Sequence, residues 1–128
     1  MSTSHQNLTD KELIELAAKA AGLEGEWQRD TSFVQERYCF EISYINQGMM
    51  TGVEWNPLRE DGDALQLAVK LQLEIRPGLG ATSVSNVCYK DPLSFVWYDG
   101  DPYKATRRAI VMAAAKIAKI NEEGECDD

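Results

Sequence analysis

The longest amphipathic segment lies near the C-terminal end of the chain, and it constrains the fold more than any other feature. It follows Asp-Gly-Asp-Pro at 99–102, where Asp101 suits the N-cap of a helix. Pro102 suits the first helical position, because the N–H that proline lacks would be unpaired there anyway. The residues at helical spacing over 103–121 are Thr106, Ala109 or Ile110, Ala113, Ile117 and Ile120. A helix with one apolar stripe must cover another element, and the remaining sequence offers a sheet.

Two shorter helices are expected before this one. Thr9 and Glu12 have the spacing of a capping box, which predicts a helix over about 10–21. The apolar residues of that helix are Leu13, Leu16, Ala17, Ala20 and Ala21, followed by Gly22 as a natural terminator. A second helix is predicted over about 64–71, where Asp63 and Gln66 again have capping-box spacing. Its expected buried face consists of Leu65, Ala68 and Val69.

The segments between the helices have the character of strands. Residues 38–45 alternate between two sets of side chains, which is typical of a strand with one buried face. The turn residues at 46–48 and a return strand at 49–55 complete a hairpin. Two further strands are predicted at 83–89 and 93–98, and a short apolar piece at 73–77, which ends at Pro77 before a turn at Gly78-Leu79-Gly80, leaves a third strand open.

The order of these elements indicates an α+β fold. Helices alternate with groups of strands rather than with single strands, which favours a mostly antiparallel sheet of four or five strands covered by three helices. Whether the helices cover one face of the sheet or both stays open. We expect a single domain over 9–121, a flexible N-terminus at 1–8 and an acidic C-terminal tail at 122–128.

The acidic composition narrows the classes of partner. Thirteen Lys and Arg against twenty-one Asp and Glu give a net charge of −8. Five of the acidic residues lie in the tail, so the rest of the chain has thirteen basic and sixteen acidic residues, a net −3. Direct binding of nucleic acid is disfavoured, because phosphate contacts need a basic surface. The tail is interpreted as a solvated end, with mimicry of nucleic acid in a basic protein groove as the alternative.

The expected location is the cytoplasm. No apolar run approaches the roughly twenty residues that span a membrane, and the polar N-terminus lacks the apolar core of a signal peptide. Cys39, Cys88 and Cys126 form no CxxC pair and do not make a zinc site with the single histidine. Reduced thiols are therefore expected, and neither a metal nor a cofactor is predicted.

Three segments, read in order, resemble a known family. They are ELIELAAKAAGLEGEW, WNPLREDGDALQLAVKL and ATRRAIVMAAAKI. Together they are similar to the phage ABA sandwich domain family of small phage and prophage proteins, and the resemblance spans most of the chain. The stretch SFVQERYCFEISYINQGM looks like an insertion beside that pattern. The resemblance implies an α-β-α layered sandwich and a phage-encoded accessory protein in the infected bacterial host, with no catalytic residues to carry over.

The central segment, at 55–63, contains most of the candidate binding residues. The carboxylates of Glu60, Asp61 and Asp63 could bind Mg²⁺ or Ca²⁺, but the EF-hand pattern is absent. Capping of the following helix explains these carboxylates better. Trp55 and Asn56 precede a proline at a turn, so Trp55 either stays partly exposed for a partner or packs against that helix.

A second candidate group lies at the start of the last helix. Lys104, Arg107 and Arg108 could hold an anion with help from the helix dipole. The alternative is a solvated face whose arginines pair with acidic residues from the edge of the sheet. Tyr98 and Tyr103 are nearby in the sequence, and Trp97 is expected in the core because it lies within a predicted apolar strand.

Catalysis is poorly supported, since His5 is the only histidine and lies outside the predicted domain. The leading hypothesis is a non-enzymatic protein that inhibits a host defence protein by direct binding, as anti-CRISPR proteins do. A binder that sequesters a nucleotide defence signal is the alternative, and a metal-dependent hydrolase that uses Asp61 or Asp63 is weaker. A homodimer is also expected, through an edge strand in the segment FEISYI at 40–45.

Overall fold

The computed structural model describes residues 8–30, 37–46 and 49–123, and it has three helices and two three-stranded antiparallel sheets. The helices are α1 (Asp10–Ala20), α2 (Asp61–Lys70) and α3 (Pro102–Glu123). The first sheet contains β1 (Gly25–Asp30), β2 (Arg37–Asn46) and β3 (Met49–Glu54). The second contains β4 (Glu74–Pro77), β5 (Ala81–Ser85) and β6 (Ser94–Trp97). The predicted α+β class is therefore confirmed.

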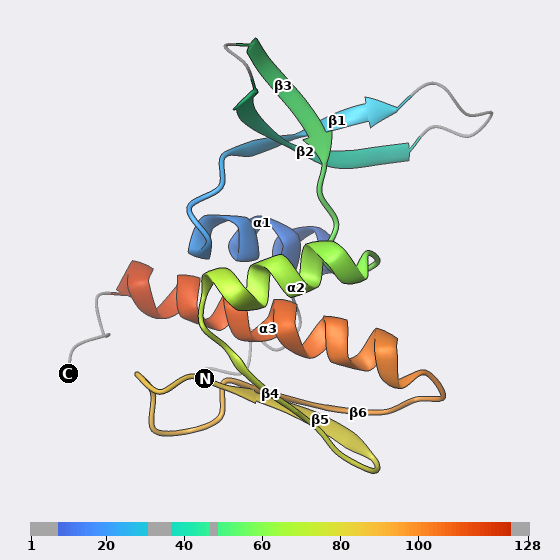
Figure 1. Ribbon diagram of the computed structural model, residues 1–128, viewed down its shortest axis with the longest axis vertical. Coiled ribbons are helices and arrows are strands. Elements are labelled where there is room, and N and C mark those ends of the chain that lie inside the picture. Colours follow the sequence, from blue (N-terminus) through green and yellow to red (C-terminus); the bar gives the residue numbers. More distant parts are fainter. Residues whose placement is uncertain (1–7, 31–36, 47–48, 124–128) are drawn as a thin grey trace.

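The three helices lie between the two sheets, as Figure 1 shows, and α3 is the central element. α3 packs against α1, α2 and all three strands of the second sheet. One sheet of four or five strands is not confirmed, and neither is the α-β-α layer order. Two separate sheets form because every described strand pairs only with strands adjacent to it in the sequence. The strands before α2 make one sheet, and the strands after α2 make the other.

The first helix forms as the sequence predicts. The Thr9 hydroxyl accepts a hydrogen bond from the Glu12 N–H at 3.1 Å, and the Glu12 carboxylate accepts one from the Thr9 N–H at 2.9 Å. This is the predicted capping box. The buried residues of α1 are Leu13, Ile14, Ala17 and Ala18. Small residues on this face allow the close approach of α1 to α3.

The last helix is longer and more buried than the predicted stripe requires. Asp101 caps it, because its carboxylate accepts hydrogen bonds from the N–H groups of Tyr103 and Lys104 at 3.0 and 3.2 Å. The buried residues of α3 are Ala105, Ala109, Ile110, Val111, Ala113, Ala114, Ala115, Ile117 and Ala118. They surround most of the helix, since neighbours contact it on several sides. α3 ends at Glu123 rather than Asn121, and residues 1–7 and 124–128 of the predicted termini lie outside the described residues.

The buried face of α2 differs from the prediction. Ala64, Leu67 and Ala68 are buried, whereas Leu65 and Val69 are 61% and 67% exposed. Both sets fit helical spacing, so periodicity alone could not separate them. α2 packs mainly against α3, and a face with two alanines fits closely against that alanine-rich helix.

The first sheet attaches to the helices through aromatic side chains. The ring of Phe40 lies 5.2 Å from that of Trp27 and 6.3 Å from that of Trp55, and these rings pack with the main core. A Cβ on Gly25 would lie 2.5 Å from the Phe40 ring, so only glycine permits this approach of β1 to β2. β2 is the central strand, which makes the predicted edge strand at 40–45 wrong for 41–42, since these pair on both sides.

The second sheet lies directly on α3. Thr82 and Val84 of β5 are fully buried, and the Thr82 hydroxyl lies 2.8 Å from that of Thr106 in α3. The Ser94 hydroxyl of β6 donates to the Ala109 carbonyl at 2.6 Å. The predicted strand at 83–89 is wrong beyond Ser85, because the chain turns at Asn86, whose side-chain oxygen accepts from the Cys88 N–H at 2.7 Å and whose carbonyl accepts from the Tyr89 N–H at 3.0 Å.

Candidate functional site

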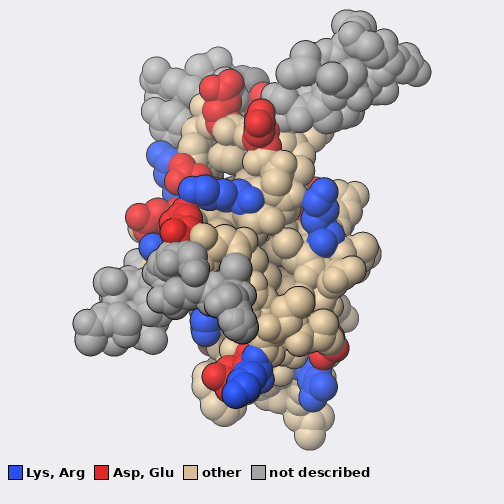
Figure 2. Space-filling model, turned by 90° about the vertical axis from the view of Figure 1, so that its left-hand side faces the viewer, with Lys and Arg blue, Asp and Glu red and all other residues tan. Residues whose placement is uncertain are grey.

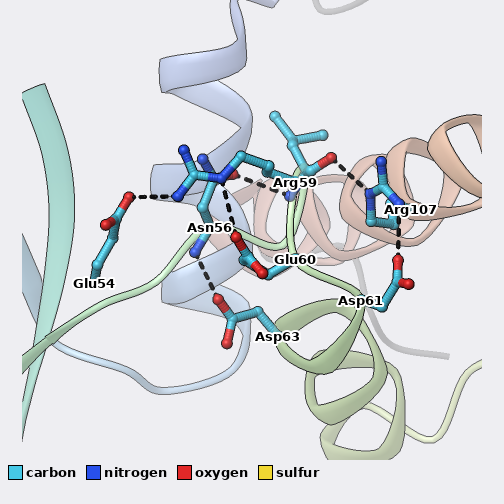
Figure 3. Close-up of polar contacts among 8 residues, drawn as sticks. Glu54, Asn56, Arg59, Glu60, Asp61, Asp63 and Arg107 are labelled. Carbon is cyan, nitrogen blue, oxygen red and sulfur yellow. Dashed lines mark hydrogen bonds and ion pairs between the residues drawn. The ribbon is translucent and has the colours of Figure 1, made fainter. Parts of the chain in front are cut away.

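The central segment forms a joint between β3, α2 and α3, shown in Figure 3, which we call the Trp-Asn-Pro joint (Trp55–Asp63). Its centre is Asn56, whose side-chain oxygen accepts a hydrogen bond from the Leu58 N–H at 3.2 Å. The Asn56 carbonyl accepts from the N–H groups of Arg59 and Glu60, at 3.0 and 2.8 Å. Asn56 therefore stabilises the turn through hydrogen bonds to both its side-chain oxygen and its carbonyl, and the side-chain bond is that of an Asx turn.

Asp63 does not cap α2 with Gln66 in the predicted way. Its carboxylate instead accepts a hydrogen bond from the Asn56 N–H at 2.9 Å, and so ties the turn to the first helical turn. The N-cap residue is Glu60, whose side chain makes no capping hydrogen bond. The helix begins at Asp61, earlier than predicted, because the turn places this residue in helical conformation directly after Glu60.

Arg59 is the residue of the joint that sequence analysis missed. Its guanidinium donates to the carboxylates of Glu54 and Glu60, at 3.0 and 3.1 Å. The hydrogen bond to Glu60, with the nearby charge of Glu54, raises the pKa of Arg59 above its ordinary value. The neighbouring Arg59 and Glu60 were a signal of this pairing, but the position of Glu54 at the end of β3 follows only from the fold.

Arg107 connects the joint to α3 and joins the two groups of residues that the sequence suggested separately. Its guanidinium donates to the Asp61 carboxylate at 2.7 Å and to the Leu58 carbonyl at 3.0 Å. The Arg107 side chain is only 18% exposed, whereas that of Asp61 is 77% exposed. Arg107, a candidate for binding an anion, and Asp61, a candidate for binding a metal ion, thus pair with each other.

The other basic candidates do not converge with Arg107. Arg108 donates to the Asp10 carboxylate at 2.9 Å and so joins α3 to the first turn of α1. Lys104 is exposed in the first turn of α3. The acidic partners of Arg107 and Arg108 therefore come from α2 and α1, whereas the alternative drawn from the sequence placed such partners at the edge of the sheet. On the face shown in Figure 2, acidic and basic side chains are interspersed.

The two candidate tryptophans have opposite environments, and only that of Trp97 contradicts the prediction. Trp55 is 3% exposed, and its backbone N–H donates to the Phe40 carbonyl at 2.8 Å. Trp97 is 71% exposed, although its strand reads as apolar. The prediction of a buried Trp97 is wrong because Ser94 and Val96 of β6 face the core, while Phe95 and Trp97 lie on the opposite face of the sheet.

Phe95 and Trp97 form an exposed aromatic pair on the outer face of the second sheet. Their ring centroids are 5.1 Å apart in an edge-to-face arrangement, and Phe95 is 54% exposed. Opposite them on β5 are the small residues Ser83 and Ala81. Beyond β5, Arg76 and Glu74 of β4 lie 3.9 Å apart and balance each other in charge. The outer face thus has an aromatic ridge beside a flat strip.

A shallow groove lies between α1 and the first sheet. Its volume is about 370 Å³, and its lining is Glu15, Ala18, Lys19, Leu23, Glu24, Gly25, Trp27 and Phe40. The Trp27 ring N–H donates to the Glu15 carboxylate at 2.6 Å, and the Lys11 ammonium lies 5.3 Å from the ring centre. The polar groups around Trp27 are therefore engaged with one another.

The structure adds two further observations. Residues 8–30, 37–46 and 49–123 contain no group of three or more His, Cys, Asp or Glu that could hold a metal ion. Within the same ranges, none of the helices combines the length and apolar character needed to cross a membrane. The chain matches no protein-family model, no curated protein and no solved structure.

Proposed function

We propose that this protein acts by binding another protein, as a non-enzymatic inhibitor of a host defence protein in a phage-infected bacterium. The observation that carries the binding role is the exposed Phe95–Trp97 pair. Large aromatic side chains are enriched among the residues that dominate binding energy at protein interfaces. The host and the anti-defence role rest on the sequence resemblance and on the net charge of −8, which suits a basic partner.

The geometry of the Trp-Asn-Pro joint supports binding over catalysis. Asp61 and Asp63 accept hydrogen bonds from Arg107 and from the Asn56 N–H, which gives both carboxylates a structural role. The same pairing weakens the nucleotide alternative, because Arg107 and Arg108 already hold carboxylates. The charged candidates therefore have structural partners that explain their positions. Among the described residues, no such contact explains why Phe95 and Trp97 are exposed.

The proposal is tested by affinity purification from lysate of a bacterial host, with the wild type, Trp97→Ser and Leu65→Ser. Leu65 is a matched control, because it is an exposed apolar residue on α2 rather than on the second sheet. We expect a stoichiometric protein partner with the wild type and with Leu65→Ser, and its loss with Trp97→Ser. A partner retained by Trp97→Ser, or no stoichiometric partner at all, contradicts the proposal.

Inhibition is then measured with the purified partner. Addition of the wild-type protein should abolish the activity of that partner, and Trp97→Ser should leave it intact at the same concentration. A partner that binds through Trp97 and keeps its full activity would support a binding protein but contradict an inhibitor.

A further inference from the structure

The edge of the second sheet next to the aromatic pair carries backbone groups available for pairing. The Tyr98 N–H donates to the Gly80 carbonyl of the adjacent turn at 2.9 Å. Alternate residues of a strand present their amides to the same neighbour, so the Val96 amide faces β5. The amides of Phe95 and Trp97 therefore face away from β5, where no strand of the described residues pairs with β6.

Two binding elements thus coincide on β6. Its outer edge offers the N–H and C=O groups of Phe95 and Trp97, and the rings of the same two residues stand on the adjoining face. Extended peptides bind other proteins in this way: main-chain hydrogen bonds give affinity, and contacts of alternate side chains give specificity.

The charges around β6 favour a basic occupant. Asp91 precedes the strand, and Asp99 and Asp101 follow it, all three in exposed positions. The basic residues nearby are Lys90 in the preceding loop and Lys104 in the first turn of α3, so the surroundings keep an excess of negative charge. The whole chain has a net charge of −8, which attracts a cationic segment and opposes a second copy of the protein.

The area of the face also disfavours a second copy. Three strands about 4.8 Å apart, each four or five residues long, give a footprint on the order of 200 Å². A stable dimer buries about 800 Å² per partner. The face therefore fits a short segment better than another folded copy that contacts it alone.

We propose that the free edge of β6 binds an extended, basic segment of the partner protein, which adds to the sheet as a fourth strand. Alternate apolar side chains of that segment pack on Phe95 and Trp97, and its Lys or Arg residues lie near Asp91 and Asp99. This inference rests on the proposed function, since it specifies the part of the partner that the exposed aromatic pair recognises.

The test is selection from a displayed library of random ten-residue peptides. The wild type should enrich peptides with apolar residues at alternate positions and a positive net charge. The affinity of a selected peptide should fall about tenfold or more with Trp97→Ser, as for an interface hot spot. Leu65→Ser is the control and should leave the affinity unchanged. Enrichment of acidic peptides, or equal binding to the wild type and Trp97→Ser, overturns the inference.

Two measurements with a selected peptide separate strand addition from simple aromatic contact. N-methylation at the backbone positions that face β6 should weaken binding about tenfold or more, and N-methylation at the alternate positions should not. The double variant Asp91→Asn/Asp99→Asn should weaken binding severalfold at low salt and have less effect at high salt. Equal effects of both methylation patterns contradict strand addition.

The outcomes also distinguish this inference from the proposed function. If the lysate partner binds through Trp97 while its binding segment is acidic or helical, the function stands and the inference fails. If no partner and no peptide bind, both fail. Sedimentation at increasing concentration identifies a second copy as the occupant: dimers of the wild type, with Trp97→Ser remaining monomeric, overturn the inference.

Discussion

The two sheets have the same number of strands but are held to the helices in different ways. β4–β6 lie along α3, with Val84 and Thr82 fully buried and hydroxyl contacts to the helix. β1–β3 attach mainly through the rings of Trp27, Phe40 and Trp55. Because few groups attach the first sheet, each of them matters more there than a comparable residue does in the second sheet.

The two sheets also differ in where their aromatic residues point. In the first sheet Trp27 and Phe40 pack with the main core and hold the sheet in place, whereas Phe95 and Trp97 of the second sheet face solvent. The second sheet can present aromatic residues outward because small polar residues and Val84 already secure its inner face. The difference shows that a short apolar strand does not by itself identify the side that becomes core.

The largest effect is expected from Trp55→Ala, which tests whether the first sheet depends on its aromatic contacts. Truncation of a buried tryptophan should lower the free energy of unfolding by about 3–5 kcal/mol. Trp97→Ala is the matched control, because Trp97 is 71% exposed, and it should change stability by less than about 0.5 kcal/mol. Chemical denaturation of the two variants and the wild type measures both changes in the free energy of unfolding.

Hydrogen exchange sharpens this test. In Trp55→Ala the amides of β1–β3 should lose protection to a greater extent than those of β4–β6, because the second sheet keeps its own contacts with α3. Equal loss of protection in both sheets would show that they unfold as one unit, and the contrast between them would be wrong.

A smaller effect is expected from Gly25→Ala, at the point where β1 approaches β2. The added Cβ would lie 2.5 Å from the Phe40 ring and 2.6 Å from the Glu41 carbonyl, so the backbone must shift. We expect a loss of about 1–3 kcal/mol in the free energy of unfolding.

Gly62→Ala is the matched control for Gly25→Ala. Gly62 lies in α2 with nothing within 4 Å of an added Cβ, so this change should stabilise the protein by up to about 1 kcal/mol. If Gly25→Ala were neutral or stabilising as well, the close contact of β1 with Phe40 would not restrain the first sheet.

The smallest effect concerns a surface pair that belongs to neither sheet. Lys19 of α1 donates to Glu122 of α3 at 2.6 Å, and this hydrogen bond and the positive charge of Lys19 lower the pKa of Glu122. A carboxylate with a lowered pKa stabilises the fold above its unfolded pKa, and the contribution is lost as the pH falls through the folded pKa.

Lys19→Gln should therefore raise the pKa of Glu122 toward its ordinary value, as followed by NMR titration of the carboxyl carbon. Lys116→Gln, an exposed lysine on the same helix as Glu122, should leave that pKa nearly unchanged. Hydrogen exchange in both sheets should be unaffected by Lys19→Gln, since the pair joins only the two helices. If the pKa of Glu122 stays unchanged in Lys19→Gln, Lys19 and Glu122 do not form this ion pair between α1 and α3.

Local signals in the sequence were sufficient for much of the fold. The capping box of Thr9 with Glu12 and the Asp101-Pro102 start of α3 depend on residues a few positions apart, so their hydrogen bonds follow from spacing. β2 and β3 pair as the predicted hairpin, although residues 47 and 48 of its predicted turn lie outside the described residues. These predictions are confirmed because the interacting groups are neighbours in the chain.

The candidate site was predicted less well, because its contacts depend on the fold of the turn and on the docking of α2 on α3. The sequence singled out Asp61 and Arg107 but assigned them to separate sites, and their pairing depends on the docking of α2 on α3. Arg59 was overlooked because its partner Glu54 comes from the end of β3. The Asn56 contact with Asp63 replaced a predicted cap of equal local plausibility.

By itself the sequence determined the α+β class, the three helices and the hairpin of β2 and β3, since propensity, capping and periodicity act over a few residues. It did not reveal β1, and it extended the strand at 83–89 beyond Ser85. Only the tertiary structure decided that the strands form two sheets around central helices. It also decided that Trp55 is buried while Trp97 is exposed. The segment that contains Trp55 and the strand that contains Trp97 both read as apolar in the sequence. In the second sheet, the face that becomes core depends on the small side chains with which α3 meets β4–β6. This is a complementarity between segments far apart in the chain.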